Sequence, residues 1–157
     1  MYEQAASEFG AALDRLARSY EADADVRRDL LQEIHLALWR SLDGFRGQCS
    51  LRTWVYRVAH NVAATHVLKR RRAANWLRLE DIDEPFQDPA ATYAQQDLIE
   101  RLHRLIRQLQ PLDRELVLLY LEGVEASEIS EITGVSARNV ATKIHRIKKF
   151  LREVAHD

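Results

Sequence analysis

Apolar residues recur at intervals of three and four along most of this 157-residue chain. This spacing is that of amphipathic α-helices, and no stretch keeps the two-residue alternation of a β-strand. In the first half, Gly44 and Gly47 interrupt the pattern, and Ser50 is suited to cap the helix that follows. The pattern predicts four helices in this half, over about 3–20, 25–42, 51–60 and 63–72.

Residues 80–92 separate the first half from a second helical half. They hold two of the three prolines and five acidic residues, a composition typical of a linker. Periodicity resumes with a helix over about 98–109, then with another that begins at Pro111 and ends at Gly123. The sequence therefore predicts an all-α protein of two small helical domains, residues 1–76 and 94–157, joined by an acidic linker at 77–93.

The last part of the chain has the pattern of a helix-turn-helix. A short helix over about 126–132 is followed by Gly134, which suits the left-handed backbone of a tight turn, and by Ser136, which can cap the next helix. That next helix is apolar on one face and rich in hydrogen-bond donors on the other, as expected of a helix that enters a DNA major groove. The alternative is a basic surface helix in an ordinary helical bundle. The candidate DNA-binding residues on this helix are Arg138, Asn139, Thr142, Lys143 and Arg146.

Charge is distributed unevenly along the chain, although the net charge is only −1. Residues 46–79 hold eight Arg or Lys and residues 137–152 hold six, and neither block contains an acidic residue. Both blocks would attract a polyanion such as DNA. The alternative is that they are two solvated helix faces. The absence of acidic residues from both blocks, in an otherwise acidic chain, favours the nucleic-acid interpretation.

The first basic block also carries aromatic residues. Cationic side chains hold a phosphate backbone and aromatic rings stack on unpaired bases, so this mixture favours single-stranded or distorted DNA. Trp54 and Tyr56 are two apart on a helix and cannot share a face, so we expect one of them in the core. Asn61, at a predicted helix end, either pairs with an extruded base or caps the helix. The candidates in and beside this block are Phe45, Arg46, Arg52, Trp54, Arg57, Asn61, Lys69, Arg70 and Arg71.

A polar row runs along the second predicted helix, opposite its apolar stripe. Asp29, Gln32 and Glu33 belong to this row, and Leu36 is an apolar residue within it. An apolar residue in a polar row indicates either a partner surface or the edge of the core, and the spacing alone favours neither.

Other chemistry is scarce in the sequence. The six histidines lack metal-ligand spacing with carboxylates, and the single cysteine, Cys49, excludes an intramolecular disulfide or a multi-cysteine zinc site. Cys49 is either an inert thiol or a redox sensor. We therefore expect no catalysis, no cofactor and no metal. Because neither a transmembrane stretch nor a secretion signal is visible, we expect no membrane insertion and a cytoplasmic location.

Two segments together resemble the bacterial RNA polymerase sigma factors of the extracytoplasmic-function group. DLLQEIHLALW resembles that family's region two helix, and FRG, LRTWVYRVAHN and LKRRR resemble its promoter-melting and minus-ten-reading segment. QPLDRELVLLYLEGVEASEISEITGVSARNVATKIHRIKKFLR resembles its region four. The matched stretches are residues 29–72 and 109–152. The family often has Asp where this chain has Thr65, so the minus-ten preference does not carry over.

The resemblance implies a transcription initiation factor that binds core RNA polymerase and melts promoter DNA. Asp29, Gln32, Glu33 and Leu36 would dock on the polymerase. Phe45 would help to wall a pocket for a flipped minus-ten base, with Asn61 and residues 62–66 forming a specificity loop over it. The helix-turn-helix would read the minus-thirty-five element, and an anti-sigma factor or controlled synthesis would hold the protein inactive. The alternative is a stand-alone helix-turn-helix regulator with an N-terminal interaction domain.

Overall fold

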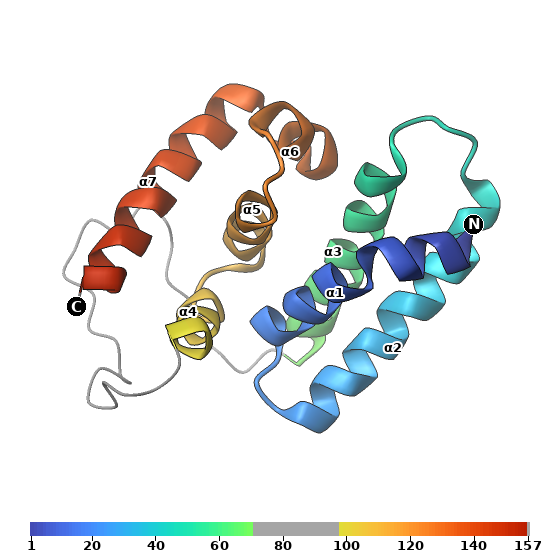
Figure 1. Cartoon of the computed structure of the whole chain (residues 1–157), viewed down its shortest axis with the longest axis horizontal. Helices are drawn as coiled ribbons and strands as arrows, with labels where there is room; N and C mark the ends of the chain where they lie inside the picture. The colour runs from blue at the N-terminus through green and yellow to red at the C-terminus, as the bar shows by residue number, and fades with distance from the viewer. Residues whose placement is uncertain (71–97, 157) are drawn as a thin grey trace.

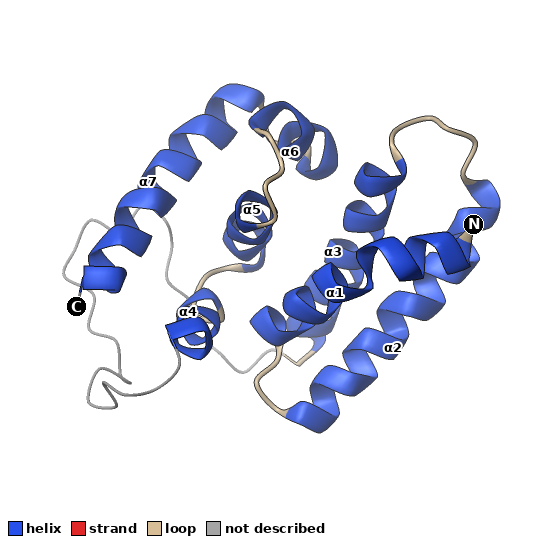
Figure 2. Cartoon of the chain, in the orientation of Figure 1, coloured by secondary structure: helices blue, strands red, loops and turns tan. Residues whose placement is uncertain are grey.

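The computed structural model describes residues 1–70 and 98–156, which fold entirely into helices and connecting loops (Figures 1 and 2). This confirms the predicted all-α class. The expected linker at 77–93 lies outside the described residues. The first half contains α1 (Tyr2–Tyr20), α2 (Ala24–Ser41), the 3₁₀ turn η1 (Leu42–Gly44) and α3 (Leu51–Lys69). The second contains α4 (Leu98–Ile106), α5 (Pro111–Leu121), α6 (Ala126–Thr133) and α7 (Ala137–His156).

Local sequence signals set several helix boundaries. The Asp23 carboxylate accepts hydrogen bonds from the first backbone amides of α2, at 2.8 and 3.2 Å. The Ser50 hydroxyl accepts the amide of Thr53 at 3.0 Å and so begins α3, as predicted. Gly134 has φ +80°, the left-handed conformation that the turn between α6 and α7 requires. The amide of Asn139 donates to the hydroxyl of Ser136 at 3.2 Å, which confirms the predicted cap of α7.

The predicted break between two helices near residue 61 is wrong. The helix α3 runs without interruption from Leu51 to Lys69. No glycine or proline lies in this stretch, and Ala59, Ala63 and Val67 continue the buried face across the expected break. Asn61 is therefore an exposed mid-helix residue, and residues 62–66 are helical instead of forming a loop.

Each half packs around buried apolar side chains. Leu13 on α1, Leu30 and Ile34 on α2, and Val55 on α3 are all fully buried. In the second half, α5, α6 and α7 pack around a similar set, which includes Ile129, Ile132, Val140 and Ile147. Phe150 near the end of α7 is also buried.

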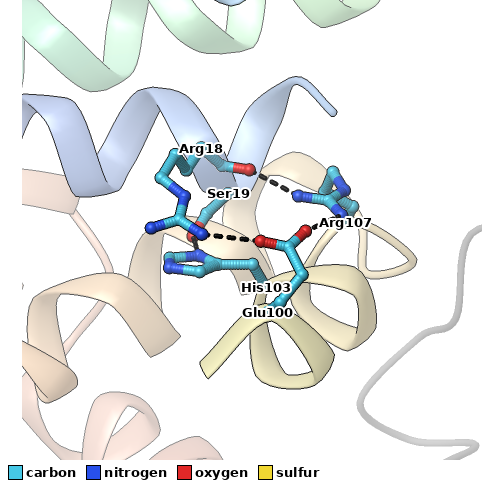
Figure 3. Close-up of polar contacts among 5 residues, drawn as sticks. All are labelled: Arg18, Ser19, Glu100, His103 and Arg107. Carbon is cyan, nitrogen blue, oxygen red and sulfur yellow. Dashed lines mark hydrogen bonds and ion pairs between the residues drawn. The ribbon is translucent and has the colours of Figure 1, made fainter. Parts of the chain in front are cut away.

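The two halves also pack on each other. The helices α4 and α5 contact α1, while α5 and α6 contact α3. A polar cluster joins α1 to α4 (Figure 3): Arg18 Nη2 donates to Glu100 Oε2 at 2.6 Å, and the Ser19 hydroxyl lies 2.6 Å from His103 Nδ1. Arg107 Nη1 donates to the carbonyl oxygen of Arg18 at 2.6 Å. The two predicted domains are thus in direct contact here. None of the helices within the described ranges is both long and apolar enough to cross a bilayer.

Glu115 on α5 gives the fold a pH dependence. Burial raises the pKa of this carboxyl to about 7, above the ordinary glutamate value that it regains on unfolding. The stabilisation from the protonated form is complete below the pKa of the unfolded state and is lost as pH rises through the pKa of the folded state.

Glu115→Gln removes this pH dependence. Between about pH 4.5 and about pH 8, its free energy of unfolding is therefore expected to rise by about 2 kcal/mol relative to that of wild type. Contact of part of the Glu115 side chain with water keeps this value below the full effect of the pKa difference. Urea unfolding at both pH values measures this. Glu8→Gln, at an exposed position, is the control, and an equal difference at both pH values would contradict the assignment.

Candidate nucleic-acid interface

The polar row of α2 lies on the surface of the molecule. Asp29, Gln32 and Glu33 are exposed, and Leu36 is 47% exposed, which favours a partner surface over the edge of the core. Trp39 continues the row one turn further and is 60% exposed. Sequence reasoning missed Trp39, although its three-residue spacing from Leu36 indicates the same face.

A groove of about 420 Å³ lies between this row and α3. It brings together residues predicted for two different partners, since Glu33 and Leu36 line one side and Asn61 and Lys69 line the other. Thr65 and His66 of α3 lie between these last two along the groove.

Arg70, predicted to bind DNA, is paired within the protein at the end of α3. Its Nη1 lies 2.7 Å from Glu21 Oε1, and the same carboxylate oxygen contacts His66 Nε2 at 2.9 Å. Lys69 is exposed. Arg71, also predicted to bind DNA, lies outside the described residues.

The loop between η1 and α3 holds Phe45 against Trp54. The two ring centroids are 5.2 Å apart in an edge-to-face arrangement, and Trp54 Nε1 donates to the Ser41 hydroxyl at 3.1 Å. Trp54 is half-buried and links the loop to the end of α2. Arg46 folds back on η1 and donates to the carbonyl oxygen of Asp43 at 2.6 Å. Phe45 is half-buried, while Tyr56 is the ring that belongs to the core.

Two further candidates for DNA binding, Arg52 and Arg57, contact α6. Arg52 forms a two-pronged ion pair with Glu128, with Nε donating to Oε1 at 3.0 Å. Arg57 Nη2 donates to the carbonyl oxygen of Glu131 at 2.6 Å. Hydrogen bonds from Arg52 hold the pKa of the Glu128 carboxyl below its ordinary value.

The candidate residues on α7 divide into two groups. Arg138, Asn139 and Thr142 are exposed near the start of the helix. Lys143 and Arg146 are half-buried instead, and Lys143 Nζ lies 3.7 Å from the carboxylate of the buried Asp113. Lys143 therefore lies toward α5. Because Lys143 and Arg146 are both less exposed than the first group, the fully exposed donor face of α7 is narrower than the helical spacing predicted.

Comparisons with known proteins match both halves of the chain. The sigma-70 region 2 profile matches residues 6–73, and the sigma-70 region 4 profile matches residues 99–151. The ECF RNA polymerase sigma-E factor of Haemophilus influenzae is 26% identical over 137 residues, which cover 78% of this chain and 71% of that protein. The RNA polymerase sigma factor YlaC of Bacillus subtilis is 29% identical over 139 residues, covering 82% and 77%.

The chain belongs to the extracytoplasmic-function group of the sigma-70 family. Its fold agrees with that of a solved sigma factor, RpoE of Bartonella quintana, whose structure was determined in complex with the anti-sigma factor NepR. The two structures superimpose with a TM-score of 0.72 at 22% sequence identity, and the match covers 99% of this chain and 96% of that one. The protein is therefore a sigma factor that directs RNA polymerase to promoters, and it is not an enzyme. The two-region match excludes the alternative of a stand-alone regulator.

Within this sigma factor, His145 is a further candidate that sequence reasoning missed. It is exposed on α7 and follows Arg138 and Thr142 at helical spacing, so these three residues form one outward row. The helical spacing of His145 from Thr142 is visible in the sequence, where the histidines were interpreted only as possible metal ligands.

Proposed function

We propose that the exposed row of α2 is the surface by which this sigma factor docks on core RNA polymerase. Asp29, Gln32 and Glu33 would provide polar contacts, with Leu36 and Trp39 as apolar anchors. The observation that carries this proposal is the exposure of Leu36 and Trp39 within an otherwise polar row. We further propose that residues 1–76 and 94–157 act as the region 2 and region 4 domains, joined by the linker 77–93.

The loop that carries Phe45 would receive the flipped minus-ten base. Trp54 supports this assignment indirectly, because its ring packs edge-to-face against Phe45 and is anchored to Ser41. Unstacking a base costs a few kcal/mol, so a ring that is already positioned offers a favourable contact in return. Asn61 and Lys69 would contact the neighbouring DNA from the groove that they line.

The outward row of α7 would read the minus-thirty-five element. Arg138, Asn139 and Thr142 are exposed at the start of the helix, the part that enters the major groove in helix-turn-helix proteins. His145 would extend this row. Lys143 and Arg146 would contact the DNA backbone from the side of the helix, and Lys143 would also hold α7 to α5 through Asp113.

Two variants of α7 test this assignment in holoenzyme reconstituted from the chain and bacterial core polymerase. Arg138→Ala is expected to weaken upstream DNA contact by about 1–3 kcal/mol without changing stability, because the side chain is exposed. Lys143→Ala is expected to lower stability as well, because it removes a cation beside the buried Asp113. DNase footprinting and thermal unfolding measure the two effects. Unaltered upstream protection with Arg138→Ala would reject the reading role.

We also propose that an anti-sigma factor regulates the protein and that it acts in the cytoplasm, where the polymerase is found. The fold likeness to a sigma factor in complex with an anti-sigma factor supports the first point. The lack of a membrane-spanning helix among residues 1–70 and 98–156 is consistent with the second.

A further inference from the structure

The start of α3 carries two arginines that already have partners in the second half of the chain. Arg52 pairs with both carboxylate oxygens of Glu128, and the same carboxylate accepts a hydrogen bond from Thr53 Oγ1 at 3.2 Å. Arg57 donates to the Glu131 carbonyl oxygen, less than one turn further along α6. We call this set of interactions the α3–α6 contact.

A guanidinium group that holds a carboxylate in two places is also well suited to a DNA phosphate. Both anions present two oxygens to the same fork of N–H donors. Glu128 therefore stands where a phosphate oxygen pair would bind Arg52. The contact is open to an incoming phosphate, because a groove of about 390 Å³ adjoins it, lined by Ser50, Arg52, Thr53, Ser127, Glu128 and Glu131.

The α3–α6 contact is also exchangeable. The side chains of Arg52 and Glu128 are 40% and 19% exposed, and ion pairs that retain this much contact with water are weak. The ion pair of Arg15 with Glu122 and the α1–α4 cluster of Figure 3 also join the two halves, so loss of the α3–α6 contact is expected to loosen their packing without separating them fully.

We propose that Arg52 and Arg57 alternate between two partners, α6 of the same chain in the free protein and DNA phosphates in the promoter complex. Glu128 then competes with DNA, and region 4 masks part of the basic face of region 2 until the halves separate. The proposal rests on the DNA-binding role that the sequence predicts for these two arginines, within the promoter-binding function proposed above.

Two measurements on the free chain test this. The first is energy transfer between dyes attached through Asp43→Cys and His145→Cys, in a chain in which Cys49→Ser removes the native thiol. The second is binding of a fluorescein-labelled single-stranded oligonucleotide of mixed sequence, followed by anisotropy. The variants are Glu128→Gln, the double variant Arg52→Gln/Glu128→Gln, and Glu8→Gln, which makes the same charge change at an exposed site on α1.

Glu128→Gln is expected to lower energy transfer and to tighten oligonucleotide binding about three- to fivefold, while Glu8→Gln changes neither beyond its charge effect. The double variant should keep the lower transfer and lose the gain in affinity. Unchanged transfer in Glu128→Gln would overturn the α3–α6 contact. Lower transfer with no more affinity than Glu8→Gln would overturn the masking. If the double variant binds as tightly as Glu128→Gln, the DNA-binding role of Arg52 fails while the contact itself stands.

Discussion

Glu33→Lys is expected to abolish recovery of core RNA polymerase by the tagged sigma factor. Glu33 is exposed in the middle of the docking row on α2, beside Leu36. An acidic row calls for a basic or donor-rich partner surface, and the lysine would face like charge there. Such a reversal costs about 3 kcal/mol at an interface, roughly a hundredfold in affinity. A pull-down with purified bacterial core polymerase measures the loss.

The matched control for this experiment is Glu8→Lys, the same charge reversal on the exposed face of α1. It should leave polymerase recovery unchanged. Thermal unfolding should give similar midpoints for both variants, since the one ion pair described for Glu33 is a long contact of 3.9 Å with His66. Wild-type recovery of polymerase by Glu33→Lys would reject the docking surface.

Local signals explain why most of the fold was predictable. The turn of the helix-turn-helix depends on Gly134 and Ser136, which act within a few residues of their own positions. Helical spacing put Asp29, Gln32 and Glu33 on one face of α2, whereas the exposure of Leu36 had to come from the structure. The break predicted near Asn61 failed because it was inferred from a polar residue without any glycine or proline to end the helix.

Contacts between distant residues explain what was not predictable. Arg52 and Glu128 are separated by 76 positions, and nothing near either residue indicates the other. The spacing of basic residues therefore identified Arg52 as available for DNA, whereas the structure gives it an internal partner. Trp54 is similar, since its hydrogen bond to Ser41 depends on how α3 packs on α2.

Arg114 is a buried cation that joins three parts of the fold. It is 3% exposed, and its Nε donates to the carbonyl oxygen of Leu109 at 2.7 Å while Nη2 donates to that of Arg107. These carbonyl groups lie just after the end of α4, where no backbone N–H of the helix is left to donate to them. The guanidinium carbon also lies 5.5 Å from the centre of the Tyr20 ring on α1. Burial lowers the pKa of Arg114 to about 10, so it remains charged near neutral pH.

Arg114→Met is therefore expected to destabilise the protein by about 3 kcal/mol, because methionine fills much of the space but donates no hydrogen bond to these two carbonyl oxygens. Urea unfolding measures the change, and Arg28→Met on the exposed surface of α2 should shift the free energy by less than about 0.5 kcal/mol. Tyr20→Leu separates the two contributions. If the ring contact matters, the effects of Tyr20→Leu and Arg114→Met will be less than additive. If Arg114→Met has the same urea midpoint of unfolding as wild type, these hydrogen bonds do not stabilise the connection between α4 and α5.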